Sequence, residues 1–136
     1  MNISRALLQE VVDHALEDPR NEVCGVIAVG ADGERAARSV HRATNVHASP
    51  MKFEIDPMEL LALYNEIEGR GDELGAIYHS HVRSAPYPSQ TDVNFAANWP
   101  GVEWLIVGLA AGSEPQVRSY LIADGTIEEV PVGEPA

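Results

Sequence analysis

Residues 74–81 read LGAIYHSH, an apolar stretch that runs directly into two histidines separated by one residue. A short apolar run of this kind predicts a buried strand, here over residues 73–80. Side chains two positions apart leave the same face of a strand, roughly 6.5–7 Å apart. His79 and His81 can therefore converge on one ion, while Ser80 should point to the other face, toward a backbone group. Taken alone, the pattern also fits two polar residues on an exposed face.

N-terminal to this strand, the sequence predicts two helices and three strands. Apolar residues at helical spacing indicate a helix over residues 3–17, with Ser4 as a possible N-cap. Asp56 and Pro57 are the residue types of an N-cap and a first helical position, so a second helix should begin there and end near Gly69. The predicted strands are residues 23–29, residues 34–44 after an Asp32-Gly33 hairpin turn, and residues 51–55.

C-terminal to the histidines, the sequence predicts one more helix and three strands. The helix should begin near Ser89 and is ended by Trp99-Pro100-Gly101. The resulting order, α-β-β-β-α-β-α-β-β-β, mixes hairpins with helices. This order predicts an α/β fold, a three-layer domain with a mixed sheet flanked by helices. The last three predicted strands are residues 103–110, 116–123 and 126–132.

The length of 136 residues predicts a single domain over residues 1–136, with a flexible end at 132–136. The single cysteine, Cys24, excludes an intrachain disulfide and a cysteine-rich zinc ribbon, so any metal must use histidine and carboxylate ligands. The net charge is −12, from 9 basic and 21 acidic residues, and a surface of this sign repels nucleic acid. No stretch approaches the ~20 apolar residues of a membrane span, and the N-terminus is unlike a signal peptide. We therefore expect a cytoplasmic protein without membrane or nucleic-acid partners.

A third metal ligand and a general base can be proposed from the residues on either side of the histidine pair. Asp92 lies eleven residues after His81, in the first turn of the predicted third helix. Ser89, three residues earlier, completes a Ser-x-x-Asp pattern that is also typical of a helix-capping pair. The same serine could cap the helix or face the ion. Glu22 stands directly before the first buried strand, where it could act as an acid and base in hydrolysis.

Together these positions resemble the JAMM motif of the MPN metalloprotease family. The spacing His-Ser-His-x7-Ser-x2-Asp matches throughout, with Glu22 upstream, and the segment 53–57, FEIDP, is also similar to this family. Val82 departs from the proline that many members have after the second histidine. The resemblance implies a cytidine-deaminase-like fold and one zinc ion per chain, with Glu22 as general acid/base and Ser89 as oxyanion donor. It implies that the zinc ligands are His79, His81 and Asp92.

Several segments resemble a compact actinobacterial subgroup that hydrolyses sulfur-carrier-protein–cysteine adducts; they are residues 77–81, 87–93, 118–120 and 124–125. This resemblance implies cleavage of an amide bond at the Gly-Gly C-terminus of a small ubiquitin-like sulfur carrier, with release of cysteine in cysteine biosynthesis. An isopeptidase or a maturation protease for other ubiquitin-like tails stays an alternative. A non-catalytic MPN scaffold that only binds a partner is a further alternative.

Some residues and the oligomeric state stay open at this point. Cys24 adjoins Glu22 and could be taken for a nucleophile, but it lies in an apolar run and is expected to be a buried structural thiol. Arg83 and Arg118 are candidates to contact the tail of the carrier or an acidic surface. Asn45 could donate a hydrogen bond to a tail that binds as an added strand. A homodimer is left open.

Overall fold

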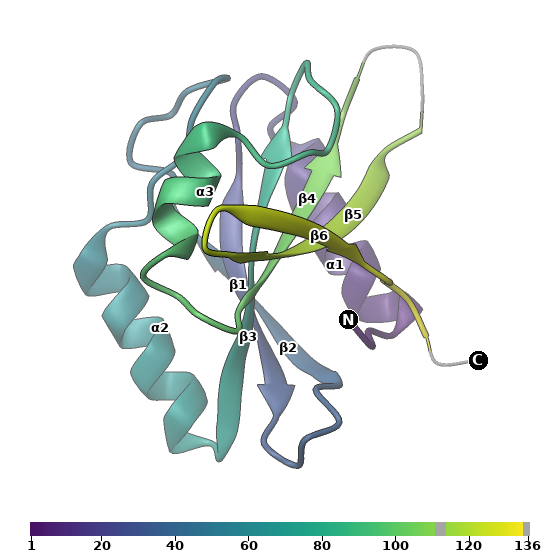
Figure 1. Cartoon of the computed structure of the whole chain (residues 1–136). Helices are drawn as coiled ribbons and strands as arrows, with labels where there is room; N and C mark the ends of the chain where they lie inside the picture. Colours follow the sequence, from purple (N-terminus) through teal and green to yellow (C-terminus); the bar gives the residue numbers. More distant parts are fainter. Residues whose placement is uncertain (111–113, 135–136) are drawn as a thin grey trace.

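The computed structural model describes residues 1–110 and 114–134, and it is built on one six-stranded sheet (Figure 1). The strand order is β2-β1-β3-β4-β5-β6. Only β3 and β4 pair in parallel, and the other neighbours are antiparallel, so the predicted mixed sheet is confirmed. The strands are β1 (Cys24–Gly30), β2 (Ala37–Ala43), β3 (Asp72–His81), β4 (Glu103–Gly108), β5 (Gln116–Ala123) and β6 (Thr126–Val130).

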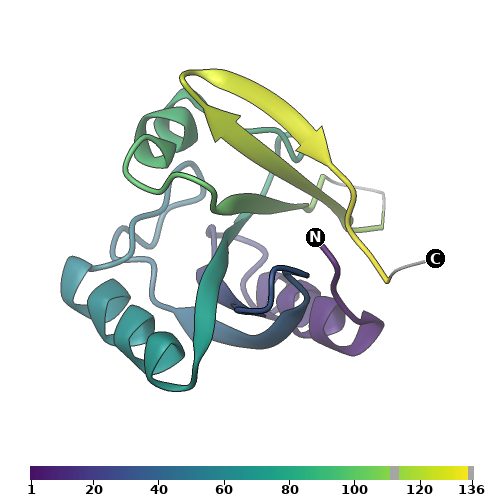
Figure 2. The same cartoon turned by 60° about the horizontal axis from the view of Figure 1, so that its bottom comes forward.

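Three helices cover the two faces of this sheet, which confirms the three layers. Helix α1 (Arg5–Glu17) lies on one face, and α2 (Pro57–Gly69) and α3 (Gln90–Ala96) lie on the other (Figure 2). Val11 of α1 belongs to one hydrophobic cluster, and Ile67 of α2 belongs to a second cluster on the opposite face. Full burial of a side chain of this size stabilises the fold by about 1.5–3 kcal/mol. Both faces of β1 and β4 are therefore buried, which explains their nearly continuous apolar sequences.

The helix starts that the sequence predicts are confirmed by their caps. The Ser4 hydroxyl accepts from the Leu7 N–H at 3.2 Å, and the Asp56 carboxylate accepts from the Met58 N–H at 2.8 Å. Helix α1 begins at Arg5 rather than at residue 3, because the Ile3 N–H donates to the Gly133 carbonyl at 3.0 Å instead of entering the helix.

The predicted strand over residues 51–55 is wrong. Among the described residues, this segment makes one isolated bridge, between Ile55 and Asn45. The Asn45 side chain donates to the Lys52 carbonyl at 3.0 Å and accepts from the Glu54 N–H at 3.1 Å. Because a side-chain amide takes up these backbone groups, they cannot join a strand ladder. The element order is therefore α-β-β-α-β-α-β-β-β, with one strand fewer than predicted.

Other predicted boundaries shift by a few residues. Strand β2 begins at Ala37 rather than at residue 34, because residues 31–34 form a turn and Arg35 has a φ of 54°. Helix α3 ends at Ala96, and turns rather than helix continue toward Gly101.

The expected flexible end at 132–136 makes backbone contacts where the structure describes it. Gly133 donates to the Met1 carbonyl at 3.1 Å and accepts from the Ile3 N–H at 3.0 Å. These backbone hydrogen bonds hold residues 132–134 against the start of the chain. Residues 135–136 lie outside the described part of the chain, so the expectation for them stays untested. No helix in the described ranges combines the length and the apolar character that crossing a membrane requires.

Gly25 in β1 leaves room for an aromatic ring that comes from β3. Gly25 faces Tyr78 across the strand pair, and a Cβ at this position would lie 2.4 Å from the Tyr78 ring and 2.5 Å from the His41 carbonyl oxygen. The Tyr78 hydroxyl is hydrogen-bonded to Nδ1 of His14 on α1 at 2.7 Å. Because Gly25 has no side chain, the Tyr78 ring fits against it and ties α1 to the sheet. Gly25 lies three residues after Glu22 along the chain.

Candidate metal centre

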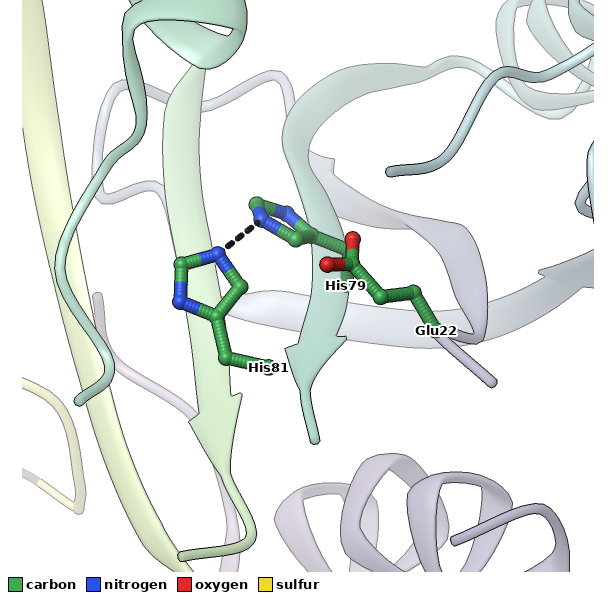
Figure 3. A group of neighbouring side chains, drawn as sticks. All are labelled: Glu22, His79 and His81. Atoms are coloured by element: carbon green, nitrogen blue, oxygen red, sulfur yellow. Dashed lines mark hydrogen bonds between the residues drawn. The ribbon is translucent and has the colours of Figure 1, made fainter. Parts of the chain in front are cut away.

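Strand β3 places the two histidine rings on the same face, as its alternation predicts. Nε2 of His79 lies 3.1 Å from Nε2 of His81, and both residues are buried (Figure 3). Ser80 points to the other face, where its hydroxyl accepts from the Val23 N–H at 2.9 Å. Both expectations for this tripeptide are confirmed. The Ser80 contact also anchors the residue that follows Glu22.

Helix α3 brings a carboxylate to the same point. Oδ2 of Asp92 lies 3.2 Å from Nε2 of His79 and 3.9 Å from Nε2 of His81, and Asp92 is buried. The Ser89 N–H donates to Oδ2 of Asp92 at 2.8 Å, and the Asp92 N–H donates to the Ser89 hydroxyl at 3.2 Å. This reciprocal capping box confirms the capping interpretation of Ser-x-x-Asp. The cap also orients the Asp92 carboxylate toward the histidines.

Glu22 lies two residues before the start of β1, and its side chain reaches the histidine pair. One ligand atom from each of Glu22, His79 and His81 lies within 4.8 Å of the others. Figure 3 shows the Glu22 carboxylate beside the His79 ring. The Glu22 backbone is held on both sides, because its N–H donates to the Ser49 carbonyl at 2.8 Å and its carbonyl accepts from the Asn45 side chain at 3.0 Å. Glu22 is 7% exposed, so it is buried at the site and does not lie on the open surface.

The two carboxylates of the site have opposite pKa shifts. Burial raises the pKa of Glu22 to about 7, with the negative charge of Asp92 adding to the rise and His79 opposing it. Burial also acts to raise the pKa of Asp92, but the hydrogen bond and charge of His79 and the Ser89 N–H together hold it below its usual range. Asp92 is therefore the ionised carboxylate at neutral pH, and Glu22 is the one that can gain and lose a proton there.

The environment of His81 favours the neutral ring that metal binding requires. Burial, followed by the neighbouring His79, lowers the pKa of His81, so its ring is neutral. Nδ1 of His81 is 2.9 Å from the Ala85 carbonyl, a contact that places the ring hydrogen on Nδ1 and leaves the lone pair on Nε2. The His79 ring is stacked on Phe53, with ring centroids 4.4 Å apart. Among the described residues, Nδ1 of His79 has no hydrogen-bond partner, so the ring is oriented by its stacking on Phe53 and by the contacts of its Nε2.

These residues fit a tetrahedral ion. An ion with bonds of about 2.0–2.1 Å holds its ligand atoms roughly 3.3 Å apart. The three atoms contributed by His79, His81 and Asp92 are separated by 3.1, 3.2 and 3.9 Å. Two imidazoles and one carboxylate form a donor set of the kind that binds zinc and leaves a fourth position free. The arrangement is thus a candidate metal centre with room for one more ligand.

The centre opens into a cleft of about 280 Å³. Glu22, His81 and Asp92 form part of its wall, together with Phe53 and Ser89. The rim of the cleft comes from two loops and from the start of α3; it consists of Pro50, Met51, Lys52, Arg83, Ser84 and Thr91. A substrate bound in the cleft would therefore meet His81, Asp92 and the Glu22 carboxylate together.

The remaining candidate residues differ in whether they are buried, ion-paired or part of the cleft. Cys24 is fully buried, and burial, with Glu59 and Glu22, raises its pKa to about 12, so it is the expected inert thiol. Arg118 is ion-paired with Glu129 at 3.1 Å and does not line the cleft. Arg83 does line the cleft.

The sequence did not single out Phe53 or Lys52 as parts of the site, and it suggested a different role for Asn45. Each acts through contacts between segments distant along the chain. The FEIDP segment that begins at Phe53 is the one local signal that pointed to this loop. For Lys52, the one available signal is that it is the single lysine of the chain.

Comparison with known proteins identifies the family. A family model described as prokaryotic homologs of the JAB domain matches residues 4–123. The chain belongs to this family. The expected JAMM/MPN resemblance is therefore confirmed. The solution structure of a Desulfitobacterium hafniense protein superposes on the JAB-family chain with a TM-score of 0.85 and 27% identity, covering 98% of this chain and 92% of that one.

Two curated relatives of the JAB-family chain are named as enzymes. The CysO-cysteine peptidase of Mycobacterium tuberculosis is 34% identical over 126 residues, which are 93% of this chain and 85% of that protein. The desampylase of Haloferax volcanii is 40% identical over 102 residues, which are 74% of this chain and 72% of that protein. The JAB-family chain is accordingly a hydrolase of the JAMM type.

Proposed function

We propose that this chain is a zinc-dependent hydrolase that cleaves the amide bond at the C-terminal Gly-Gly of a small ubiquitin-like sulfur carrier and releases cysteine. The observation that carries the proposal is the convergence of four side chains beside the cleft: the imidazoles of His79 and His81, an ionised carboxylate and a second carboxylate with a pKa of about 7. A relative that matches over 93% of the chain is named CysO-cysteine peptidase.

His79, His81 and Asp92 would hold one zinc ion per chain. Zinc bound there would polarise the scissile carbonyl group and make a water molecule acidic enough to ionise near neutral pH. Asp92 is preferred to Glu22 as the third ligand because its carboxylate approaches both imidazoles and its pKa is lowered. The Ser89 N–H and the Ala85 carbonyl orient Asp92 and His81 from outside the site, as partners of metal ligands commonly do.

Glu22 would move the proton. Its carboxylate takes a proton from the attacking water, and the resulting hydroxide attacks the carbonyl carbon of the scissile amide. Glu22 then returns the proton to the leaving amine as the C–N bond breaks. A pKa of about 7 suits both steps, because the group is readily ionised and readily reprotonated near neutral pH.

Ser89 would stabilise the oxyanion of the tetrahedral intermediate. Its hydroxyl oxygen accepts from the Asp92 N–H, which leaves the hydroxyl hydrogen free to be donated into the cleft that Ser89 lines. One donor of this kind is worth about 2.7–4 kcal/mol of transition-state stabilisation. The serine would thus both cap α3 and take part in catalysis.

A second candidate function is cleavage of lysine conjugates of a ubiquitin-like protein, or trimming of a carrier extended beyond Gly-Gly. The relatives named desampylase keep this alternative open. The small cleft favours a single amino acid as the leaving group.

Mass spectrometry of three substrates tests the proposal. The purified, zinc-loaded enzyme is incubated with a carrier–cysteine adduct, a carrier extended by a short peptide and a carrier–lysine conjugate. We expect the adduct to be cleaved fastest, with one equivalent of cysteine released, and Glu22→Gln to retain zinc but lose turnover. Faster cleavage of the lysine conjugate would favour the second candidate, and zinc below one ion per chain would contradict the metal assignment.

A further inference from the structure

We propose that Lys52 and Arg83 form a carboxylate-binding subsite that recognises the α-carboxylate of the leaving amino acid. The inference rests on the proposed function and names the feature of the substrate that the cleft selects. Lys52 and Arg83 lie on opposite sides of the histidine pair in sequence, yet both line the cleft that contains Glu22 and Asp92. Both are exposed at its rim.

Positive charge is scarce in this chain, and part of it is already paired outside the cleft. The chain has nine basic residues against 21 acidic ones. Four arginines outside the cleft are ion-paired with carboxylates, and they are Arg38, Arg42, Arg70 and Arg118. In the described part of the chain, the side chains of Lys52 and Arg83 form no ion pair and no hydrogen bond. The two cations at the cleft are therefore free to bind an anion from solution.

The cleft needs these cations if its substrate is anionic. Glu22 and Asp92 give its wall negative charge, and the net charge of −12 repels anions further. A carboxylate entering next to these groups would be disfavoured unless nearby cations offset the repulsion. Lys52 and Arg83 are the two basic residues of the cleft lining, so they are the groups placed to do this.

The segments that bear the two cations are fixed to the catalytic residues. The backbone carbonyl of Lys52 accepts from the Asn45 side chain at 3.0 Å, and the same amide donates to the Glu22 carbonyl at 3.0 Å. Arg83 lies between His81 and Ala85, which are joined through Nδ1 of the imidazole at 2.9 Å. The two side chains are flexible, but their points of attachment are held relative to the general base and the imidazole pair.

The chemistry of the leaving group explains why such a subsite would select adducts of a single amino acid, such as cysteine, over lysine conjugates. When an amino acid is linked through its α-amino group, its free carboxylate is two bonds from the leaving nitrogen. In a lysine side-chain conjugate, the carboxyl group lies at the far end of the side chain and is bound in a peptide. A cation pair beside the metal centre therefore distinguishes a single amino acid from a protein lysine. Arginine and lysine form charge-assisted hydrogen bonds to such a carboxylate.

Two substrates that differ in one charge test the subsite. One is the carrier–cysteine adduct, and the other is the matching carrier–cysteinamide adduct, in which the carboxylate is neutral. We expect the wild-type enzyme to prefer the carboxylate form by about 10- to 100-fold in kcat/KM, mainly through KM, as for a charge-assisted hydrogen bond. In Lys52→Met/Arg83→Met the ratio between the two substrates should fall toward one. Lys52→Arg should retain most of the preference, and the control Arg118→Met should retain all of it.

A binding measurement tests the carboxylate subsite separately from the proposed function. Calorimetry with the Gly-Gly-Cys tripeptide and its amide, titrated into zinc-loaded Glu22→Gln, reports the subsite without turnover. Tighter binding of the acid, lost in the double variant, supports the subsite even if the adduct proves not to be the substrate. Equal binding of acid and amide overturns it, and so does an unchanged substrate ratio in the double variant. Failure of the wild-type enzyme to cleave either adduct would instead contradict the proposed function.

Discussion

The side-chain amide of Asn45 donates 3.0 Å hydrogen bonds to the carbonyls of both Glu22 and Lys52. Its oxygen accepts from the backbone N–H groups of His47 and Glu54, each at 3.1 Å. One asparagine thus uses both ends of its amide to join the loop after β2 to the residue proposed as general base. Asn45 acts as a positioning residue, rather than as the donor to a substrate strand that the sequence suggested.

Replacing Asn45 should therefore affect catalysis without removing a ligand. Asn45→Ala leaves two carbonyls and two N–H groups without their partner, so we expect a loss of about 1–3 kcal/mol in the free energy of unfolding. The turnover number should fall while zinc content stays near one per chain. Urea unfolding, steady-state kinetics and metal analysis measure these three quantities. Asn65→Ala, on the exposed face of α2, is the matched control. Full wild-type turnover in Asn45→Ala would contradict the positioning role.

Ser89 and Asp92 both cap α3 and both have a proposed role in the metal centre. Substitutions can separate these two roles. Asp92→Asn keeps an oxygen that can accept from the Ser89 N–H but loses the charge that faces the histidines. We expect it to retain α3 and to lose most of its zinc. Ser89→Ala removes the cap, which costs about 1 kcal/mol of stability. It should retain zinc, and its turnover should fall about 10²- to 10³-fold if the hydroxyl stabilises the oxyanion. Stoichiometric zinc in Asp92→Asn would show that the third ligand lies elsewhere.

Glu22 should make the stability of the metal-free protein depend on pH. Its pKa is about 7 in the folded chain and 4.5 as an ordinary carboxyl, so the folded state binds the proton more tightly. The stability linked to this proton is present below pH 4.5 and is lost as the pH rises through about 7. Glu22→Gln has no such titration. Allowing for partial solvent screening, it should exceed the wild type by about 1–2 kcal/mol at pH 8, with the difference vanishing toward pH 4.5.

Urea unfolding in the presence of a chelator, repeated between pH 4.5 and 8, measures this difference. A constant difference between the two proteins over that range would show that burial does not perturb Glu22. Added zinc should make the wild type more stable than Glu22→Gln at pH 8, because a nearby cation favours the ionised carboxylate.

The contact between Gly25 and Tyr78 predicts that alanine substitutions at two glycines differ sharply in their effect on stability. In Gly25→Ala the new Cβ would lie 2.4 Å from the Tyr78 ring and 2.5 Å from a backbone oxygen, so either the strands or the ring must move. We expect a loss of stability of about 1–3 kcal/mol. Gly69→Ala, where no atom lies within 4 Å of the new Cβ, should be neutral or stabilising at the end of α2. Thermal unfolding of both variants tests the pair, and equal melting temperatures would contradict the predicted steric clash.

Much of the fold follows from patterns that a few neighbouring residues carry. The caps at Ser4, Asp56 and Ser89 are hydrogen bonds to the next turn of the chain, and the facing of His79 and His81 is the two-residue repeat of a strand. Such features depend on local geometry, so the sequence predicts them wherever the element itself forms. The five motif positions with proposed roles, Glu22, His79, His81, Ser89 and Asp92, followed from spacing together with a family resemblance.

Other features exist only once distant segments pack together. The expected strand at 51–55 does not form, because Asn45 and Phe53 use that segment to build the wall of the site. The pKa of Glu22 rises because the fold buries it beside Asp92, a residue 70 positions away along the chain. Burial and long-range hydrogen bonds are properties of the packed chain. The sequence alone therefore names the chemical groups of the site, and the tertiary structure gives them their protonation, orientation and access to the cleft.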